Sequence, residues 1–369
     1  MYWLLLSITL IPFSFLTKKK DRNYVFFLFS LIIASFLIFR FGIGVDYFGY
    51  YEIYTVYEKT YSFYTEPIFA LCNYIFNNLG LSFSFFMSFI SFLMISFTLH
   101  TINTFSENKI FTLFLFFTLY YSVYFESAIR AGFVITLFIY AYYNFLRKSK
   151  PKWYYLFILI AVGFHYTAIV LLLVPFLMKI NSRFFVNNFF ILFLLFFVFS
   201  FFLQNVFSIL VTSLIPKYSY YINKEIFSRS YFTILLCFVR GIFVITLYKK
   251  NKRIVSSTDL LDLKVYLFGI YFYILFSCFS ISSRFSDYFL FLEVFLFAKY
   301  IKPKSINSNT LMLLIFIFSI LLLTKDILSF IDYGQYKINS IHEYSYVSVF
   351  NKEKIFELRE TNVNIEGIK

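Results

Sequence analysis

Long apolar runs alternate with short, mostly basic segments along the whole chain. Runs of this length predict membrane-spanning helices, because in a bilayer each spanning segment must satisfy its own backbone hydrogen bonds. We expect about 12 spans, several of them shorter than a simple crossing needs. The predicted spans are 2–16, 24–39, 81–101, 110–125, 131–146, 153–164, 166–178, 184–211, 231–248, 264–280, 285–300 and 310–325.

The composition supports an all-α polytopic membrane protein and excludes a soluble globule. Hydrophobic residues make up 60% of the 369 positions and charged residues only 14%, against about 25% charged in a soluble domain. Cys72, Cys237 and Cys278 are widely separated, so they predict neither a disulfide framework nor a metal site. The net charge of +14 sits in short blocks between apolar runs. That placement indicates a topology signal rather than nucleic-acid binding.

The distribution of basic residues predicts the orientation. Loops on one side hold 18 Lys and Arg residues and the short loops on the other side hold 7, so the first side is cytoplasmic by the positive-inside rule. Both termini then lie outside, and Met1–Leu16 is interpreted as a first span rather than a cleaved signal peptide. We expect one transmembrane domain over 1–325, with a large first outer loop at 40–66, and an extracytoplasmic tail at 326–369.

The segment 153–178 decides the topology of everything after it. A single helix of this length would be about 39 Å long and would place the basic residues 249–253 outside. We therefore predict a break at Gly163–His165, which brings His165 to the outer surface.

The bilayer penalises charge, so polar residues that persist at membrane depth are candidates for chemistry. In this topology they gather on the predicted outer side. This set comprises Arg40, Asp46, Glu52, Glu66, Glu126, Arg130, His165, Arg284 and Asp287. Its densest stretch, 40–57, has Gly42 and Gly44 beside Arg40 and Asp46, followed by several tyrosines. The glycines allow a sharp turn, Arg40 suits phosphate oxygens, and the tyrosines suit sugar rings. A glycine turn with an interfacial aromatic belt is the structural alternative.

Other members of the set also have structural interpretations. Glu66 precedes a proline and is typical of a helix start, and Glu126 with Arg130 has the spacing of a helical ion pair. His165 is either a packed residue or a general base. Outside the set, Arg240 falls inside an apolar run, where it is either functional or paired with a neighbouring helix.

Several of these pieces together resemble the EpsG family, within the broader group of Wzy-type O-antigen and capsular polysaccharide polymerases. Arg40 and Gly44-Val45-Asp46-Tyr47 match first, followed by Glu66-Pro67 and Ala128-Ile129-Arg130. Phe164-His165-Tyr166-Thr167-Ala168 and Ser283-Arg284-Phe285 with Tyr288-Phe289 complete the match, which spans most of 25–300. Ala131 departs from the family pattern, in which Gln often follows the arginine.

The resemblance implies a transferase in the bacterial inner (cytoplasmic) membrane. Such an enzyme moves a polyprenyl-pyrophosphate-linked glycan to a lipid-linked repeat unit on the outer face, without a cofactor or metal. A chain-length regulator protein is an expected partner, and an analogy with lipid-dependent glycosyltransferases suggests a GT-C-like bundle.

The roles implied for individual residues follow from this chemistry. Arg130 and Arg284, then Arg40 and Arg240, are assigned to the pyrophosphate, whose charge arginines can neutralise. Tyr47, Glu52 and Glu66 are assigned to the sugar. The catalytic base is His165 or Asp46, and the residues leave that choice open.

Two other functional classes stay open at this point. A lipid-linked oligosaccharide flippase or transporter would show inverted repeats and polar residues at the bilayer midplane. A membrane O-acyltransferase would place its catalytic His near the cytoplasmic side or in a buried tunnel. We find no internal repeat, and apart from Arg240 the polar set lies on one side.

Overall fold

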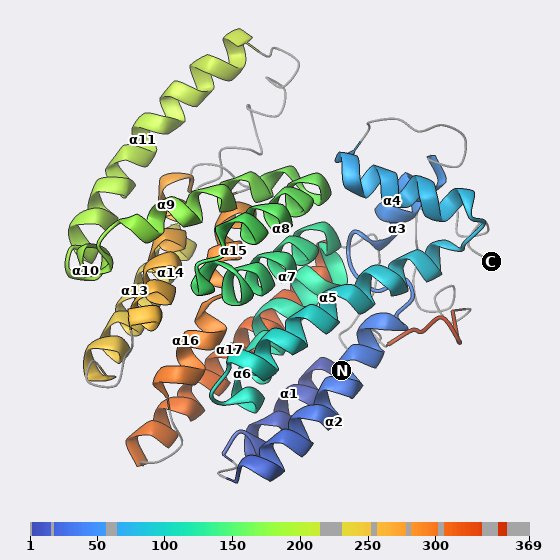
Figure 1. The fold of residues 1–369 in the computed structure, drawn as a ribbon, viewed down its shortest axis with the longest axis horizontal. Coiled ribbons are helices and arrows are strands. Elements are labelled where there is room, and N and C mark those ends of the chain that lie inside the picture. The colour runs from blue at the N-terminus through green and yellow to red at the C-terminus, as the bar shows by residue number, and fades with distance from the viewer. Residues whose placement is uncertain are drawn as a thin grey trace. The chain divides into compact units, whose positions relative to one another are not determined.

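The chain is almost entirely helical in the computed structural model, which describes residues 2–15, 18–56, 65–214, 231–251, 257–277, 282–301, 306–333 and 346–352. Figure 1 draws the chain as a ribbon with its helices labelled. The chain divides into two compact units. Unit 1 comprises Met1–Tyr166 with Ile301–Lys369, and unit 2 comprises Thr167–Tyr300. Each unit is described by itself.

Six helical stretches in the described residues are long and apolar enough to cross a membrane, so the protein is a multi-pass membrane protein. They are Lys20–Ile38, Phe83–Phe105, Lys109–Ser127, Ile129–Lys148, Tyr231–Asn251 and Asn309–Ser329. Four shorter apolar helices are Tyr2–Phe13, Pro151–Phe164, Tyr166–Lys179 and Phe189–Leu203. The helical class is confirmed, whereas the count of 12 spans stays a prediction.

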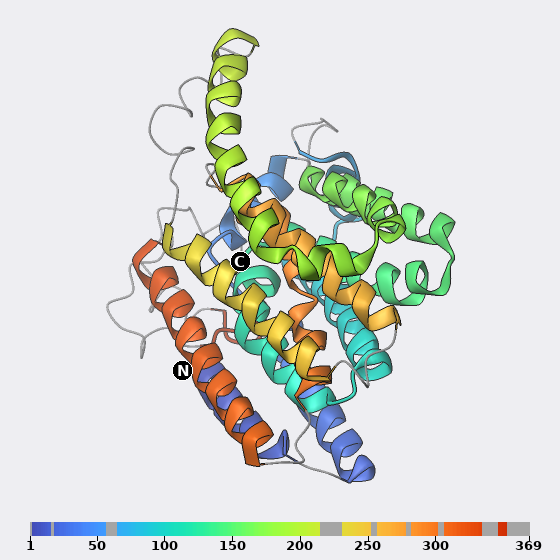
Figure 2. The same ribbon diagram turned by 90° about the vertical axis from the view of Figure 1, so that its left-hand side faces the viewer.

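Unit 1 packs its helices around a buried central one. Its elements are α1 (Tyr2–Phe13), α2 (Lys19–Ile38), α3 (Tyr47–Val56), α4 (Pro67–Asn78), α5 (Phe83–Phe105), α6 (Lys109–Phe116), η1 (Phe117–Ser127), α7 (Ile129–Asn144), η2 (Leu146–Lys148), α8 (Pro151–Phe164) and α17 (Ile306–Tyr333). α6 and η1 form the central rod, which contacts α1, α2, α7 and α17. Figure 2 shows α17 beside α1, in agreement with their contacts.

Local sequence explains where several of these helices begin and end. Ser82 caps α5, because its hydroxyl accepts a hydrogen bond from Phe85 N at 3.2 Å. Pro67 and Pro151 occupy first-turn positions of α4 and α8, where the missing N–H is not needed. Gly80 has a positive φ of 69° and closes α4.

The central rod changes its winding before it ends. η1 is a π-helix whose side chains are almost all buried, and the non-helical Ala128 (φ −86°, ψ 64°) separates it from α7. Gly132 of α7 packs so closely on η1 that a Cβ there would lie 2.2 Å from the Tyr124 carbonyl oxygen. π-helical segments are rare and frequently mark functional sites.

The predicted break between two short helices is confirmed. α8 ends at Phe164, His165 is extended (φ −157°, ψ 117°), and the 3-10 helix η3 (Tyr166–Leu173) follows. The predicted outer loop 40–66, in contrast, contains the helix α3. α3 and α4 both lie at the Phe83 end of α5 (Figure 1).

A segment of the predicted tail packs on unit 1. Phe41 N donates to Val347 O at 2.9 Å and Val349 N donates to Phe39 O at 2.9 Å. These bonds make a short antiparallel bridge between Arg40 and Ser348. We call residues 346–352 the C-terminal strap.

Unit 2 is also helical. Besides most of η3, it contains α9 (Val174–Lys179), α10 (Ser182–Asn187), α11 (Phe189–Leu214), α13 (Tyr231–Asn251), α14 (Ser257–Leu275), α15 (Ser282–Leu290) and α16 (Glu293–Tyr300). α14 is its centre and contacts α9, α10, α11, α13, α15 and α16.

Candidate functional site

Three elements of unit 1 bring Glu66, Arg130 and His165 together. Glu66 immediately precedes α4, Arg130 is the second residue of α7, and His165 follows the last residue of α8. α8 packs against both α4 and α7. Gly163 allows the approach of α4, because a Cβ there would lie 2.4 Å from the Ile68 side chain. The close contact between Gly163 and Ile68 therefore brings Glu66 within hydrogen-bonding distance of the His165 imidazole.

The carboxylate of Glu66 binds the other two side chains with separate oxygens. Oε1 lies 2.7 Å from His165 Nδ1, and Oε2 lies 2.6 Å from Arg130 Nη1. The Glu66 side chain is 7% exposed, whereas those of Arg130 and His165 are 26% and 13% exposed. Glu66 makes no side-chain cap on α4. The Glu66 carboxylate therefore binds His165 and Arg130 instead of capping α4.

The ionisation of Glu66 fixes the hydrogen-bonding roles in the cluster. Burial alone would raise the pKa of this carboxyl, but the hydrogen bond with His165 and the charge of Arg130 outweigh burial and lower the pKa from 4.5 to about 2. An ionised carboxylate only accepts hydrogen bonds, so Nδ1 of a neutral His165 must carry the proton. Nε2 is then the basic nitrogen, and it has no hydrogen-bond partner among the described residues.

Aromatic rings flank the guanidinium of Arg130. The guanidinium carbon lies 5.6 Å from the centre of the Tyr50 ring and 5.5 Å from that of Phe69. Such contacts favour a cation, and the Arg130 side chain stays 26% exposed while Nη1 binds Glu66. Within the part of the chain that is described, the buried Nε of Arg130 has no partner. The arrangement can therefore bind an anion next to the imidazole.

The glycine loop between α2 and α3 packs beside this cluster. Gly44 has a φ of 109°, and a Cβ there would lie 2.1 Å from the carbonyl oxygen of Glu126, at the end of η1. Val45 N donates to Ser127 Oγ at 3.2 Å. Only glycine allows this backbone approach, which places α3 and its Tyr50 near Arg130.

The other residues predicted in this region have different surroundings. The side chain of Asp46 is exposed at the start of α3, and that of Glu52 is exposed further along it. Tyr47, predicted to contact sugar, is fully buried and packs against Phe41 and Phe83.

Glu126 binds the N-terminal helix and not Arg130. Trp3 Nε1 donates to Glu126 Oε2 at 2.7 Å, and the Tyr2 hydroxyl donates to Oε1. The helical pair expected between Glu126 and Arg130 is therefore replaced, because the break at Ala128 ends the helical spacing.

Arg40 is buried between α2 and α5. Its Nη1 donates to Leu37 O at 2.8 Å and to Ser91 Oγ at 2.9 Å. Nε and Nη2 are buried and have no partner among the described residues. Only 2% of the residue is exposed.

The two arginines predicted in unit 2 differ from each other. Arg240 forms a two-pronged ion pair with the fully buried Glu293, which also accepts a hydrogen bond from the Tyr266 hydroxyl at 3.3 Å. The pairing of Arg240 with a neighbouring helix, one of its two predicted interpretations, is therefore observed. Arg284 is exposed in the first turn of α15, near Asp287 in the sequence.

Sequence reasoning missed the central position of Glu66 and the part played by Tyr50. The proline after Glu66 indicated a helix start, so the sequence offered no reason to expect that the Glu66 carboxylate binds both His165 and Arg130. The cluster otherwise depends on contacts across 64 and 99 residues, for which the sequence has no local signal.

Comparison with known families identifies the family of the chain. The model of the EpsG family matches residues 23–342, which include the whole cluster. The chain belongs to the EpsG family. This is a family of polysaccharide polymerase-like membrane proteins. No curated protein and no solved structure matches the chain.

Proposed function

We propose that this EpsG-family protein polymerises a polysaccharide at the outer face of the bacterial cytoplasmic membrane. The donor is a glycan on polyprenyl pyrophosphate, and the acceptor is a hydroxyl of a lipid-linked repeat unit. Family membership supports the class of reaction. The observation that carries the proposal is the shared carboxylate of Glu66, which holds a basic imidazole next to an arginine.

The cluster supplies the two things that this transfer requires. His165 Nε2 takes the proton of the acceptor hydroxyl while the hydroxyl oxygen forms a bond to the anomeric carbon of the donor. The bond between that carbon and the pyrophosphate oxygen breaks, and the pyrophosphate leaves with its electron pair on the prenyl carrier. Arg130 stabilises the charge that develops on the leaving group.

Glu66 acts through its neighbours in this scheme. It keeps the proton on Nδ1 and stabilises the imidazolium that forms when Nε2 accepts a proton, as a carboxylate does in a Ser-His-Asp triad. It also fixes one edge of Arg130. Glu66 thus has a positioning role in place of the sugar contact expected from its sequence.

The rival assignments are weaker on the same geometry. Asp46 is an exposed carboxylate immediately before α3, whereas His165 is 13% exposed and its Nδ1 is held by Glu66. Arg240 is engaged by Glu293. Arg284 belongs to unit 2, and its role stays a prediction from the sequence.

The test is polymerisation by purified protein in nanodiscs supplied with lipid-linked repeat units. Wild type should make a ladder of products on a gel, and His165→Ala should leave single repeat units while inserting normally. His100→Ala is the matched control, because His100 is exposed on α5 and lies outside the cluster. A wild-type protein that never extends the repeat unit would refute the proposed function. Full activity of His165→Ala would move the base to Asp46, with loss of activity in Asp46→Asn as the deciding result.

A further inference from the structure

Unit 2 has a small polar pocket of about 210 Å³ between α10 and the end of α13. Arg183, Val186 and Asn187 line it from α10, and Tyr248 and Lys249 line it from α13. We call it the α10–α13 pocket. It is smaller than the roughly 300–1,000 Å³ of a pocket for a drug-sized ligand, so it suits a compact group such as a phosphate.

The polar side chains of this pocket are all hydrogen-bond donors. Arg183 and Lys249 are exposed cations, and they are joined by the Asn187 amide and the Tyr248 hydroxyl. Among the described residues, none of these four side chains has a hydrogen-bond or ion-pair partner. No Asp or Glu is among the described residues that line the pocket. The pocket therefore combines positive charge with unused donors, which favours an anion.

Two ordinary explanations account for only part of this arrangement. Lys249 and Lys250 lie in the last turn of α13, where a cation interacts favourably with the helix carbonyls. The positive-inside rule accounts for basic residues on the predicted cytoplasmic side, to which Arg183 and Lys249 both belong. Neither explains why Arg183, from a second helix, lines the same small pocket as Lys249, because like charges in one pocket repel each other. A bound anion would offset that repulsion.

Buried contacts hold both walls of the pocket. α10 and α13 each pack on α14, the central helix of unit 2. The buried Lys264 of α14 donates to Ile180 O at 2.8 Å, just before α10 begins. Asn251 Nδ2 donates to Tyr300 O at 3.2 Å, which fixes the end of α13 to the end of α16. The donors of the pocket are thus positioned before any ligand binds, which lowers the entropic cost of binding.

The surface next to the pocket favours a phosphate that belongs to a lipid. Phe184 and Phe190, on either side of Asn187 in the sequence, are 48% and 61% exposed. The Phe190 ring packs against Phe238 with ring centres 5.5 Å apart. Phe238 lies ten residues before Tyr248 in a membrane-spanning helix, about 15 Å along its axis. A lipid could therefore place its phosphate at the helix end and its acyl chains along these rings.

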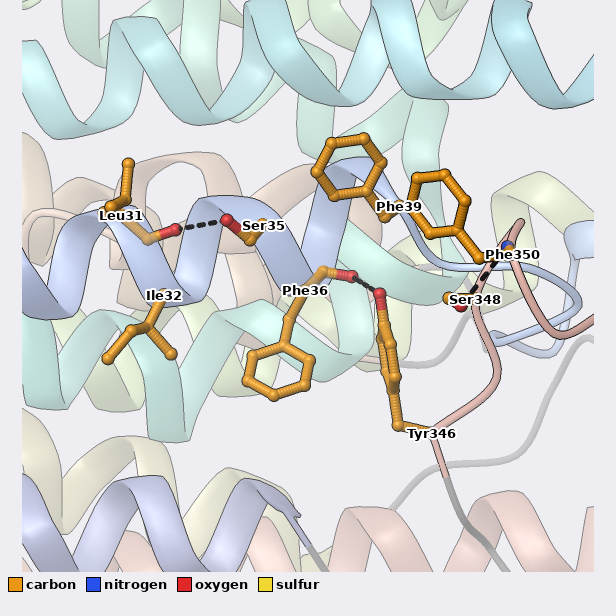
Figure 3. A pocket seen from close by; sticks show the side chains of 8 residues that line it. All are labelled: Leu31, Ile32, Ser35, Phe36, Phe39, Tyr346, Ser348 and Phe350. Atoms are coloured by element: carbon orange, nitrogen blue, oxygen red, sulfur yellow. Dashed lines mark hydrogen bonds between the residues drawn. The ribbon is translucent and has the colours of Figure 1, made fainter.

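An apolar hollow in unit 1 shows the contrast. It has a volume of about 370 Å³, and Figure 3 shows that no charged side chain is among its lining residues. Two of its hydroxyls already donate to backbone carbonyls, Ser35 to Leu31 O at 2.8 Å and Tyr346 to Phe36 O at 3.1 Å. That hollow offers neither a cation nor a free donor from these two residues, whereas the α10–α13 pocket offers both.

We propose that the α10–α13 pocket binds the phosphate of an anionic phospholipid on the predicted cytoplasmic side of the membrane. Arg183 binds phosphate oxygens with its forked donors, and Lys249 adds a second positive charge. Asn187 and Tyr248 donate to the remaining oxygens of the head group. The site belongs to unit 2, does not include Glu66, Arg130 or His165, and does not depend on the proposed polymerisation.

Thermal unfolding of the purified full chain in a neutral detergent tests the site. Short-chain phosphatidylglycerol should raise the Tm in a saturable way, because a ligand that binds only the folded state stabilises it. Phosphatidylcholine of the same chain length and inorganic phosphate should have much smaller effects. Arg183→Gln and Lys249→Gln should each raise the half-saturating concentration of phosphatidylglycerol about 10- to 150-fold, as expected for the loss of a hydrogen bond to a charged group.

Lys250→Gln is the matched control, because it removes the same charge one residue away and Lys250 does not line the pocket. It should leave the half-saturating concentration unchanged. An equal effect of all three substitutions would show a general charge effect and refute the pocket. Equal half-saturating concentrations for inorganic phosphate and the lipid would overturn the lipid assignment. The half-saturating concentration is measured within each variant, so a variant with a lower Tm still tests the proposal.

Discussion

Glu66→Gln is the most informative single change, because one carboxylate binds both proposed chemical groups. A glutamine accepts with only one oxygen and presents an amide N–H₂ to the other partner. It therefore either opposes Arg130 or donates to His165 Nδ1, which moves the imidazole proton to Nε2 and removes the basic nitrogen. A hydrogen bond to a charged group contributes about 1.5–3 kcal/mol. If that amount is lost in the transition state, kcat falls about 10- to 150-fold.

The pH dependence of stability gives a second readout for this change. Stability depends on pH because the pKa of Glu66 is lowered from 4.5 to about 2 on folding. Its stabilising contribution, up to about 3 kcal/mol, is fully present above pH 4.5 and is lost as pH falls towards 2. The Tm difference between the two proteins should therefore narrow over that range.

The assay is the rate of ladder formation in nanodiscs from pH 5 to 9, with protein amount normalised on the gel. Glu107→Gln is the control, since it makes the same chemical change on an exposed carboxylate at the opposite end of α5. Wild-type rates for Glu66→Gln would refute the positioning role. A loss of activity that is fully accounted for by a lower amount of folded protein would restrict Glu66 to holding the fold.

Further predictions follow from the same contacts. Arg130→Lys keeps the charge but loses the planar fork, and should lower kcat about 10²-fold with normal protein levels; wild-type rates would reassign the pyrophosphate. The proposed mechanism uses no metal, so activity should persist in excess EDTA, and recovery only after adding magnesium or manganese would contradict it. Arg240→Ala leaves Glu293 buried and unpaired, which should destabilise the protein by about 3–5 kcal/mol and lower its amount in the membrane, whereas Arg240→Met with Glu293→Leu should restore it. Thr55→Cys should react with an impermeant maleimide in intact cells and Lys150→Cys should not; the reverse labelling would overturn the orientation.

The helices could be predicted largely because the bilayer imposes a long apolar run on each span. The break at His165 followed from charge counting across later loops, and α8 does end at Phe164. α3 was missed because 40–57 is polar and aromatic rather than apolar. Its buried side chains, Tyr47, Tyr50 and Tyr54, nevertheless have helical spacing.

The site could be predicted only as a set of residues. Each of Arg130, Glu66 and His165 was singled out by its polarity near a membrane surface, but their pairing depends on how α4, α7 and α8 pack. The close approach at Gly163 is one such determinant, and no local pattern distinguishes it from an ordinary helical glycine. The docking of the C-terminal strap on Phe39 and Phe41 uses backbone hydrogen bonds, which carry almost no sequence signal.

Two arginine–glutamate pairs in the described residues differ in a way that distinguishes a stabilising ion pair from the one that we propose to be reactive. At Arg240, both prongs of the guanidinium meet one carboxylate, and Glu293 is fully buried beneath a tyrosine hydroxyl. At Arg130, a single nitrogen meets Glu66, whose second oxygen turns to His165. In the Arg240–Glu293 pair, the two side chains mainly bind each other. In the Arg130–Glu66 pair, the carboxylate is shared with His165, and the guanidinium stays partly exposed next to the imidazole. An intramembrane arginine is therefore a candidate for chemistry when its partner is shared, because only then does binding capacity remain for a substrate.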